Sequence, residues 1–586
     1  MGRRIAVIEK DKCHPKECGN YLCIRVCPVN RTGDECITKG GDGKAHIEAE
    51  LCTGCGICPK RCPFGAIHII NLPDDLDEDP IHRHQDENGF HLYRIPIPIF
   101  GKVTGILGRN GIGKSTAMKV LAGVLKPNLG TNKEATIDEV IHRFKGTEAQ
   151  LYFEKLRDGK IKVAYKPQAV DLIPKQFQGT VRELLVHVDE KKQLSNVVKR
   201  LQLENVLDTD ITKISGGELQ RVAIAATVLK KANVYFFDEP TSFLDIKQRL
   251  RVAEFIRELA TPNTAVMVIE HDLIILDHMT DLIHVMYGEE QAYGVVSKPK
   301  ASKAGINAYL EGYLREENMR FRDHEIKFMA KPPTETRGMT VLTGWKGIKA
   351  KLGKFQLVAK EGSLWKNEVV GILGENGIGK TSFVKILAGV SKTDAGDIDT
   401  TITVSYKPQY LEADSDEVVM VVLNDAIMSY EHLLIRPLGL KDLFQKQLNQ
   451  LSGGELQRVA IAACLAKKAD LYLLDEPSAF LDVEQRLIVA KVIREVMQQR
   501  GTTSLVVDHD ILFLDYLSDR LVVFDGEPAK RGEVNGPMSM EQGMNMFLSD
   551  IGLTFRRDME SYRPRANKPG SQMDREQKAE GKLYYT

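Results

Sequence analysis

The sequence contains one twelve-residue stretch twice, and this repeat constrains the fold more than any other feature. Ser215 to Ala226 reads Ser-Gly-Gly-Glu-Leu-Gln-Arg-Val-Ala-Ile-Ala-Ala, and residues 452–463 repeat it without a change. Two landmarks follow each copy in the same order: Asp238-Glu-Pro and His271-Asp in the first half, Asp475-Glu-Pro and His509-Asp in the second. The serine is placed to cap a helix, and the two glycines leave backbone N–H groups free to meet a phosphate. The spacing predicts two homologous domains.

The composition predicts a globular protein of several domains. The chain has 586 residues, enough for about four domains, and 43% of them are hydrophobic. No uncharged apolar run approaches the roughly 18 residues of a membrane span, and the first residues lack a signal-peptide core. The 80 lysines and arginines equal the 80 aspartates and glutamates, so no overall field points to a nucleic-acid partner. We therefore expect a cytoplasmic protein with no membrane partner, on which any nucleic-acid surface is local.

Nine of the ten cysteines lie before residue 63, in two runs. The second run has the spacing of a bacterial ferredoxin and a following proline: Cys52-x2-Cys55-x2-Cys58-x3-Cys62-Pro63. The first run keeps the Cys-x3-Cys-Pro ending but widens the earlier spacings: Cys13-x4-Cys18-x4-Cys23-x3-Cys27-Pro28. A zinc site would instead pair two Cys-x2-Cys hooks. The runs predict a ferredoxin-like iron–sulfur domain over residues 1–72, followed by an acidic linker at 73–80.

The ligand sets follow from the ferredoxin pattern, in which the fourth cysteine of each run ligates the other cluster. Two [4Fe–4S] clusters are predicted, one held by Cys52, Cys55, Cys58 and Cys27 and the other by Cys13, Cys18, Cys23 and Cys62. Cys36 is left over and is expected to be a small buried residue, as is Cys464. Because no flavin or haem motif follows, we expect the clusters to stiffen a small domain rather than to pass electrons onward.

Each half also contains a glycine-rich loop between an apolar run and a helical pattern. In the first half the loop spans residues 108–116 and satisfies the phosphate-binding pattern G-x4-G-K-[ST]. Its N–H groups cradle phosphates, Lys114 reaches the β- and γ-phosphates, and Ser115 binds Mg²⁺. We assign nucleotide binding to these residues of the two loops: Asn110, Gly111, Gly113, Lys114, Ser115, Thr116, Asn376, Gly377, Gly379, Lys380, Thr381 and Ser382.

An apolar run ends in two carboxylates in each half, at Asp238-Glu239 and at Asp475-Glu476. At the end of such a buried strand the aspartate would hold Mg²⁺, and the glutamate would polarise the attacking water. No catalytic position is lost in the second copy. The first copy carries an insertion near 131–157, where two amphipathic patterns broken at Gly146 predict a helix–loop–helix.

The phosphate loop, the carboxylate pair and the repeated serine–glycine motif together resemble the ABC family of ATPases. The resemblance implies an α/β fold of two fused ABC-type P-loop nucleotide-binding domains with an N-terminal α+β ferredoxin-like domain. It also implies roles for four further pairs of residues: Gln168 and Gln409 sense Mg²⁺ and water, His271 and His509 contact the γ-phosphate, Asp245 and Asp482 belong to the D-loops, and Tyr93 and Phe355 stack on adenine.

In this family each ATP site forms between two domains that face head to tail. The resemblance therefore implies a monomer with an internal pseudo-dimer and two pairings. The first pairing places Lys114, Ser115, Gln168, Asp238, Glu239 and His271 against Ser452, Gly454 and Glu455. The second pairing places Lys380, Thr381, Gln409, Asp475, Glu476 and His509 against Ser215, Gly217 and Glu218.

The whole chain resembles one subfamily, the ABC subfamily E ribosome-recycling ATPases, also called the ribonuclease L inhibitor family. The segments that carry this resemblance are the iron–sulfur domain at 1–72, nucleotide-binding domains at 73–295 and 334–535, and hinges at 296–333 and 536–586. It implies that closure on two ATP molecules moves the iron–sulfur domain and splits ribosomes after termination or stalling.

The implied partners are the ribosome, especially its small subunit and rRNA, a release-factor-like protein and initiation factors. The protein would remain on the small subunit toward initiation. Two other functions stay open at this point: an iron–sulfur electron-transfer protein gated by ATP, and the ATPase subunit of a transporter.

Overall fold

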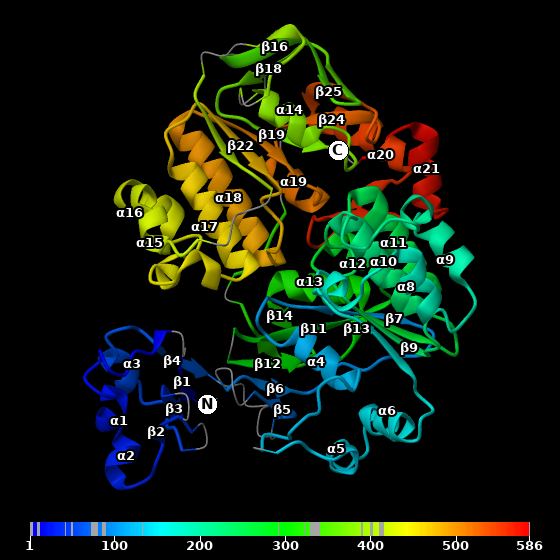
Figure 1. The fold of residues 1–586 in the computed structure, drawn as a ribbon. Coiled ribbons are helices and arrows are strands. Elements are labelled where there is room, and N and C mark those ends of the chain that lie inside the picture. The colour runs from blue at the N-terminus through cyan, green and yellow to red at the C-terminus, as the bar shows by residue number, and fades with distance from the viewer. Residues whose placement is uncertain are drawn as a thin grey trace.

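The computed structural model describes residues 4–8, 12–40, 43–48, 51–71, 80–84, 89–131, 133–290, 292–322, 324–328, 340–387, 389, 391–398, 402–409 and 415–584. Within these residues the chain forms two large α/β domains and a smaller cysteine-rich domain at the N-terminal end, which lies to one side of them in Figure 1. Most of the acidic linker predicted at 73–80, and the predicted boundary at residue 333, lie outside the described residues.

The cysteine-rich domain combines small antiparallel sheets with one-turn helices. Strand β1 (Arg4–Ile8) pairs with β4 (Ile67–Asn71), and β2 (Ile37–Lys39) pairs with β3 (Ala45–Ile47). The helices are only five residues long, too short to be stable alone: α1 (Leu22–Val26), α2 (Pro28–Thr32) and α3 (Ile57–Arg61). A few aliphatic side chains share the core with buried cysteines. Ligation of metal through those cysteines would therefore stabilise the domain strongly.

The first large domain is organised by a nine-stranded sheet, with order β5-β6-β12-β11-β7-β10-β9-β8 and β13 beside β11. Its central strands are parallel: β8 (Val163–Lys166), β9 (Val234–Asp238), β10 (Ala265–Ile269), β7 (Val103–Leu107) and β11 (Leu282–Glu289). The flanking strands are β5 (His82–Arg83), β6 (His91–Tyr93), β12 (Tyr293–Val296) and β13 (Lys300–Ala301). β7, β9 and β10 are buried at every position, as parallel strands covered on both faces should be.

The second large domain repeats this plan with a ten-stranded sheet, of order β18-β16-β17-β25-β24-β19-β23-β22-β21 with β20 beside β16. Its parallel centre consists of β21 (Val404–Lys407), β22 (Leu471–Asp475), β23 (Thr503–Val507), β19 (Val369–Leu373) and β24 (Arg520–Glu527). The other strands are β16 (Val341–Leu352), β17 (Phe355–Ala359), β18 (Gly362–Trp365), β20 (Ala395–Ile398) and β25 (Arg531–Ser539). In both domains the carboxyl ends of the parallel strands meet at one edge, where the phosphate loop and the carboxylate pair follow.

Helices cover both sheets and include the repeated motif. In the first domain they are α4 (Lys114–Leu121), α7 (Ile173–Gln176), α8 (Val181–Val188), α9 (Leu194–Arg200), α10 (Gly216–Leu229), α11 (Ile246–Glu258) and α12 (Leu273–Met279). In the second they are α14 (Lys380–Leu387), α15 (Val419–Val422), α16 (Asn424–Tyr430), α17 (Gly453–Ala466), α18 (Val483–Arg500) and α19 (Ile511–Leu517). Ser215 and Ser452 cap α10 and α17 in full capping boxes, as the motif predicts.

The insertion of the first domain forms two helices on the side of the domain away from the second domain (Figure 1). Helix α5 (Ile137–Arg143) begins at Thr136, whose side chain accepts from the backbone N–H of Glu139 in a capping box. Gly146 has φ +81° and separates α5 from α6 (Glu148–Arg157). The stacked rings of Phe144 and Phe153, 5.6 Å apart, hold the two helices together.

A linker segment follows each sheet and begins with an equivalent helix. Helix α13 (Ser302–Glu311) packs on β11, and α20 (Met540–Ile551) packs on β24. A Cβ added to Gly305 would lie 3.0 Å from the Cβ of Ile283, and one added to Gly543 would lie 2.7 Å from that of Leu521. Both positions need glycine because the helix backbone approaches the strand so closely. The remaining strands and α-helix are β14 (Tyr313–Leu314), β15 (Met319–Arg320), β26 (Phe555–Arg557), β27 (Pro564–Ala566) and α21 (Gln572–Glu580).

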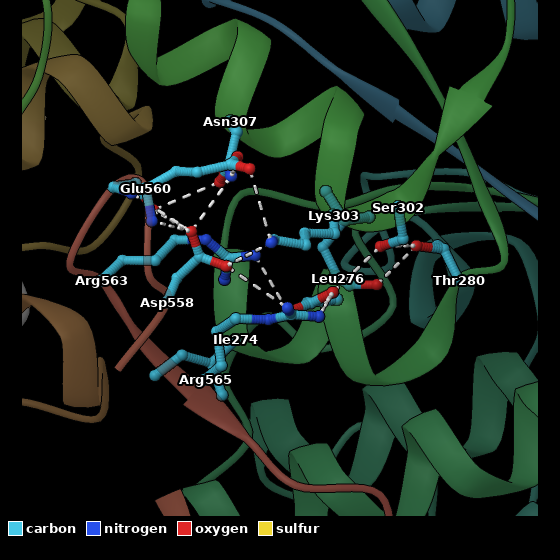
Figure 2. Close-up of polar contacts among 12 residues, drawn as sticks. Ile274, Leu276, Thr280, Ser302, Lys303, Asn307, Asp558, Glu560, Arg563 and Arg565 are labelled. Atoms are coloured by element: carbon cyan, nitrogen blue, oxygen red, sulfur yellow. Dashed lines mark hydrogen bonds and ion pairs between the residues drawn. The ribbon is translucent and has the colours of Figure 1, made fainter. Parts of the chain in front are cut away.

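The C-terminal segment is fastened to the first domain by a buried charge cluster. Figure 2 shows Asp558 of this segment beside Asn307 and Lys303 of α13. Nη2 of Arg563 and Nε of Arg565 donate to Oδ2 of Asp277 on α12, at 2.9 and 2.6 Å. Arg563 is 0% exposed, and its Nε and Nη1 have no hydrogen-bond partner in the described part of the chain. Asp277 is thus the counter-ion of a fully buried arginine. Its pKa is lowered, because the two arginines outweigh the effect of burial.

We expect Asp277→Ala to lower the stability of the protein by about 3–5 kcal/mol, because it leaves the buried Arg563 charge uncompensated. The matched control is Glu560→Gln in the same cluster, since the Glu560 side chain is 63% exposed and should change stability by less than about 0.5 kcal/mol. Urea unfolding followed by circular dichroism measures both variants. Equal midpoints for Asp277→Ala and the wild type would contradict the importance of this contact.

Candidate functional site

Each phosphate loop wraps around the amine of its own lysine. The first loop joins β7 to α4, and Gly111 and Gly113 have φ values of +73° and +85°, which other residues rarely adopt. Lys114 is 7% exposed, and its Nζ donates to the carbonyls of Gly108 and Arg109 at 2.9 and 2.6 Å. Burial lowers the pKa of this lysine, although nearby carboxylates oppose the effect.

The second loop has the same construction. Nζ of Lys380 donates to the carbonyls of Gly374 and Glu375, at 2.7 and 2.8 Å. Gly377 and Gly379 have φ values of +73° and +96°. Burial lowers the pKa of Lys380 to about 8. In both domains an amine and a ring of backbone N–H groups can therefore surround phosphate oxygens at the start of a helix. Thr116 and Ser382 lie in the first turn of these helices, and Nε2 of His84 contacts Thr116 Oγ1 at 3.4 Å.

The aspartates that end β9 and β22 lie beside the hydroxyl groups of these loops. Thr381 Oγ1 donates to Asp475 Oδ2 at 2.8 Å, and Ser115 lies close enough to Asp238 to favour the charged form of that carboxylate. Burial raises the pKa of both aspartates. Oδ1 of Asp238 is buried and has no hydrogen-bond partner among the described residues. A hydroxyl and a carboxylate oxygen with spare acceptor capacity are the donors that Mg²⁺ takes from a protein at a phosphate site.

Glu239 and Glu476 each lie beside a glutamine and a histidine. The family resemblance assigned these glutamines to Mg²⁺ and water and these histidines to the γ-phosphate. Gln168 Nε2 donates to Glu239 Oε1 at 2.8 Å, and His271 Nε2 lies 3.6 Å from the same oxygen. In the second domain Gln409 Nε2 lies 2.6 Å and His509 Nε2 lies 3.6 Å from Glu476 Oε1. The structure thus brings each predicted glutamate, glutamine and histidine together, twice with the same geometry.

The two glutamates differ in their electrostatic surroundings. Burial raises the pKa of Glu239, but the charges of His271 and Lys114 outweigh burial and lower that pKa to about 2. Burial raises the pKa of Glu476, and the carboxylates of Asp508 and Asp475 raise it further. Burial lowers the pKa of His509 well below its ordinary value. Glu239 therefore favours its charged form more strongly than Glu476 does.

One cavity of about 1840 Å³ joins parts of both domains. Lys114, Gln168, Glu239 and His271 line it from the first domain. Ser452, Gly454 and Glu455, at the start of α17, line it from the second domain. The cavity thus brings together residues of the first predicted pairing. Its lining does not include Lys380 or the second set of signature residues Ser215, Gly217 and Glu218.

The D-loop aspartates link the two domains in both directions. The backbone N–H of Asn110 in the first phosphate loop donates to Asp482 Oδ2 at 3.0 Å. In the other direction the N–H of Asn376 donates to Asp245 Oδ2 at 3.1 Å. Both aspartates are 1% exposed and also cap α18 and α11 of their own domains. Lys247 also reaches the second phosphate loop, where its Nζ donates to Glu375 Oε1 at 2.5 Å. Gln409, Glu476 and His509 of the second set line the shared cavity.

The aromatic residue at the first phosphate loop is Phe90, not Tyr93. A Cβ added to Gly113 would lie 2.4 Å from a ring carbon of Phe90, and one added to Gly379 would lie 2.8 Å from the ring of Phe355. Phe90 lines the cavity, whereas Tyr93 is 8% exposed and belongs to the core of the domain. The register of β6 explains the difference: Leu92 lies opposite Gly294 as Leu357 lies opposite Gly532, which makes Phe90 the counterpart of Phe355.

The cysteines of the two runs lie in two neighbourhoods of the N-terminal domain. Cys58 interacts electrostatically with Cys52, Cys55 and Cys27, and Cys13 interacts with Cys18 and Cys62. Cys23 belongs with Cys13 and Cys18. Backbone N–H groups point at two of the sulfurs, from Ala6 to Cys52 Sγ at 3.2 Å and from Ala66 to Cys62 Sγ at 3.4 Å.

The arrangement of the cysteines is compatible with iron–sulfur clusters, for which a family model matches residues 45–68. In the described residues, no three metal-binding side chains converge on one ion. A cube spreads its four thiolates over four iron atoms, so its ligands need not converge. Cys36 is 1% exposed beside Cys27 and Cys52, and Cys464 is 5% exposed in the second domain, where Ser405 Oγ lies 3.3 Å from its sulfur.

The sequence did not indicate that the cysteine-rich domain reaches this cavity. Lys12, His14, Lys44 and Phe64 line the cavity together with the first phosphate loop. Lys12 Nζ lies 3.2 Å from Asp442 Oδ1 of the second domain. On the other side, Arg83 Nη2 lies 3.3 Å from His46 Nε2. The cysteine-rich domain is thus in contact with both large domains at the mouth of the cavity.

Family models match all three parts of the chain. The model described as "ABC transporter" matches residues 100–242 and 360–479. The model described as "Possible Fer4-like domain in RNase L inhibitor, RLI" matches residues 3–35, and "4Fe-4S binding domain" matches residues 45–68. Together with the fold and the site, these matches define the class of the protein. It is an ATPase with two ABC domains and an N-terminal iron–sulfur domain.

Full-length relatives define the family. The chain is 51% identical, over 99% of its length, to an uncharacterized ABC transporter ATP-binding protein of Methanocaldococcus jannaschii, of which it covers 97%. It is 44% identical to ABC transporter E family member 1 of Arabidopsis thaliana and to translation initiation factor RLI1 of Saccharomyces cerevisiae, with 99% of this chain and 98% of each relative covered. The chain belongs to the ABC transporter E family, the RNase L inhibitor family.

Two solved structures agree with this fold. A structure described as "Model of ribosome-bound archaeal Pelota and ABCE1" has a TM-score of 0.93 and 53% identity, with 100% of both chains covered. The archaeal ribosome recycling factor aABCE1 in complex with the ribosomal stalk protein aP1 has a TM-score of 0.83 and 53% identity, with 87% of this chain and 100% of that chain covered. They confirm the predicted fold class. Within the described residues, no helix has both the length and the apolar character needed to cross a bilayer.

We expect Cys23→Ser and Cys58→Ser each to deplete iron, through different clusters, because each removes one thiolate ligand. Cys36→Ser is the matched control: it is a buried cysteine outside both sets and should retain about eight irons per chain, the sum of two four-iron cubes. Iron and acid-labile sulfide are measured on the purified proteins. Loss of iron in Cys36→Ser with full iron in Cys23→Ser would overturn the ligand assignment.

Proposed function

We propose that this protein is an ATP-driven ribosome-recycling factor. Its two ABC domains close on two ATP molecules, move the iron–sulfur domain and split ribosomes into subunits after termination or stalling. The observation that carries the proposal is the shared cavity, because the first phosphate loop, the second signature helix and the iron–sulfur domain all line it. Closing that ATP site must therefore displace the iron–sulfur domain. The likeness to a ribosome recycling factor and to a ribosome-bound relative supports the same function.

In each site the phosphate loop would hold the nucleotide. Lys114 and Lys380 would bind the β- and γ-phosphates, assisted by the backbone N–H groups of their loops. The rings of Phe90 and Phe355 lie against these loops and are the candidates for stacking on adenine. Signature residues would complete each site from the opposite domain, with the capped start of α17 facing the first loop across the cavity.

Mg²⁺ would be held by Ser115, Asp238 and Gln168 in one site and by Thr381, Asp475 and Gln409 in the other. When bound, the ion would neutralise charge on the phosphate oxygens. Glu239 and Glu476 would orient the attacking water and accept its proton. Both ring nitrogens of His271 are buried and have no hydrogen-bond partner in the described part of the chain, which suits a contact with the γ-phosphate. His509 would act in the same way in the second site.

The two nucleotides would drive the motion through their γ-phosphates. Moving a clamp from 1% to 99% closed takes about 5.5 kcal/mol of differential binding. Contacts to two γ-phosphates from opposite domains are a sufficient source, because each is made only when the domains meet. Hydrolysis removes these contacts, and the clamp reopens. The contact of Asp442 with Lys12 would then form again as the iron–sulfur domain returns to the position it has in this structure.

Two [4Fe–4S] clusters would make the N-terminal domain a stiff body. The domain has short helices and few aliphatic core residues, so ligation at its two cysteine sets is the available source of rigidity. A stiff domain can transmit the closing motion to a bound partner, which a deformable one cannot. We assign the partners from the family: the ribosome with its small subunit and rRNA, a release-factor-like protein, and initiation factors. The site of action would be the cytoplasm.

Both alternative functions lack this support. A transporter subunit would couple the clamp to a membrane partner, and an electron-transfer protein would use the clusters chemically. The full-length relatives include translation initiation factor RLI1 of two fungi, which favours a role in translation over either alternative. A recycling function also explains why residues of the iron–sulfur domain line the cavity, because closure of the cavity would then move that domain.

We expect the combined substitution of Glu239→Gln and Glu476→Gln to leave ATP binding intact and to lower turnover by about 10² to 10⁴, the range for loss of a positioned base. The clamp should then stay closed on ATP. Phosphate release measures turnover, and equilibrium binding of a fluorescent nucleotide measures affinity. Near-normal hydrolysis by the double variant would remove both residues from the catalytic assignment.

We expect a chain that begins near residue 75 to hydrolyse ATP but not to separate ribosomal subunits. The residues proposed to contact nucleotide all lie after residue 89, whereas closure does work on a partner only when a stiff element carries the motion. Light scattering with the release-factor-like partner present follows subunit separation. Splitting at the full-length rate by the truncated chain would show that the iron–sulfur domain is dispensable.

A further inference from the structure

A buried glutamine on each signature helix contacts the backbone of the catalytic turn. Gln220 on α10 is 0% exposed, and its Nε2 donates to the carbonyl oxygen of Glu239 at 2.6 Å. Gln457 on α17 is 1% exposed, and its Nε2 donates to the carbonyl oxygen of Glu476 at the same distance, 2.6 Å. The two domains thus make the same contact independently. Neither glutamine is among the residues assigned above to nucleotide, Mg²⁺ or water.

A second buried donor reaches each of these turns. Nζ of Lys166, at the end of β8, donates to the carbonyls of Asp238 and Glu239 at 2.9 and 3.1 Å. Nζ of Lys407 donates to the carbonyl of Asp475 at 2.7 Å and lies 3.5 Å from that of Glu476. The lysines are 0% and 1% exposed. Each carboxylate pair is therefore fixed through its backbone from both a strand end and the signature helix.

The glutamates need this support because of their backbone conformation. Glu239 has φ +45° and Glu476 has φ +46°, in the left-handed region that side chains other than glycine rarely adopt. Such a conformation persists only when surrounding contacts determine it. Oε1 of Gln220 is buried and has no hydrogen-bond partner in the described part of the chain. The amide of Gln220 therefore contributes as a donor, and the Glu239 carbonyl is what it holds.

Each signature helix also has a capped first turn, and in the proposed function this turn contacts a different ATP site from the one that the glutamine supports. Helix α10 begins at Ser215, which caps it, and Gln220 lies only five residues further along its fourteen-residue length. In the proposed function the first turn of α10 meets the nucleotide of the second ATP site, whereas Glu239 acts in the first. Likewise α17 begins at the first site and reaches Glu476 of the second. One short rigid helix thus spans from each site to the catalytic carboxylate of the other.

We propose that Gln220 and Gln457 are positioning residues that couple the two ATP sites. When the start of α10 engages a nucleotide in the second site, Gln220 carries the displacement of the helix to the Glu239 turn in the first site. Gln457 does the same in the opposite direction, as reciprocity of coupling between two sites requires. This inference rests on the proposed function, because it needs two composite sites with Glu239 and Glu476 as bases.

The first test adds Gln220→Met to a Glu476→Gln background, in which turnover reports the first site alone. Methionine keeps the length of the side chain but has no N–H donor. The fold should therefore remain, while the backbone of Glu239 loses the hydrogen bond from Gln220. We expect kcat to fall by about tenfold to a hundredfold, the cost of a small misplacement of a catalytic group, with nucleotide affinity unchanged within twofold. The matched control is Thr227→Val on the same helix, which removes only a bond within α10, from Thr227 Oγ1 to the carbonyl of Ala223. Unchanged kcat in Gln220→Met, or an equal loss in Thr227→Val, would overturn the positioning role.

The second test measures coupling in a Glu476→Gln background, where turnover reports the first site. Ser215→Ala disturbs α10 at the second site and is expected to change turnover at the first. With Gln220→Met present, the same substitution should have no further effect, because the connection is already broken. Multiplicative effects of the two substitutions, or no effect of Ser215→Ala alone, would overturn the coupling. A control variant adds Glu239→Gln to the Glu476→Gln background. If the turnover of this double variant equals that of Glu476→Gln alone, Glu239 is not the base of the first site, and the proposed function fails rather than the coupling.

Discussion

In the proposed function an ATP site is completed only when two domains meet, and the rest of the structure is interpreted from that constraint. The first phosphate loop shares a cavity with the start of α17 of the other domain, and the lining of that cavity does not include the start of α10 of its own domain. The D-loops already link the domains: Asp482 accepts from the N–H of Asn110, and Asp245 accepts from the N–H of Asn376. These contacts hold the domains in register across both sites. A nucleotide that contacts both domains of one site therefore needs to move the domains only a short distance relative to each other.

The position of the iron–sulfur domain at the shared cavity is the basis of its proposed role. Lys12 and Phe64 line the same cavity as the first phosphate loop and the second signature helix, so this domain occupies space on the path of closure. At the far side of the interface, Asp277 on α12 holds Arg563 and Arg565 of the C-terminal segment. Helix α12 starts directly after His271 and Asp272. The phosphate-sensing end of the first domain is therefore tied to the segment that follows the second domain.

Local motifs made most of the candidate site predictable, because phosphate binding needs its donors within nine consecutive residues and a carboxylate pair at a strand end. Contacts between distant segments could not be predicted in this way. Tyr93, which we predicted to stack on adenine, lies in the core, and Phe90 lies at the first loop, because positions three residues apart on a strand face opposite sides. The ion pair of Lys12 with Asp442 depends on how whole domains sit together. The role of Gln220 was hidden because a buried polar residue inside an apolar helix gives no sign of what it contacts.

The central claim is that ATP binding moves the iron–sulfur domain, and a distance between labels tests it most directly. Fluorophores at Lys16 and Met428, both exposed, report the iron–sulfur domain against the second ABC domain, and a second pair at Val186 and Met428 reports closure of the clamp. A non-hydrolysable ATP analogue should change both distances together, and ATP should restore both after hydrolysis. Closure reported by the second pair with no change in the first would contradict the account.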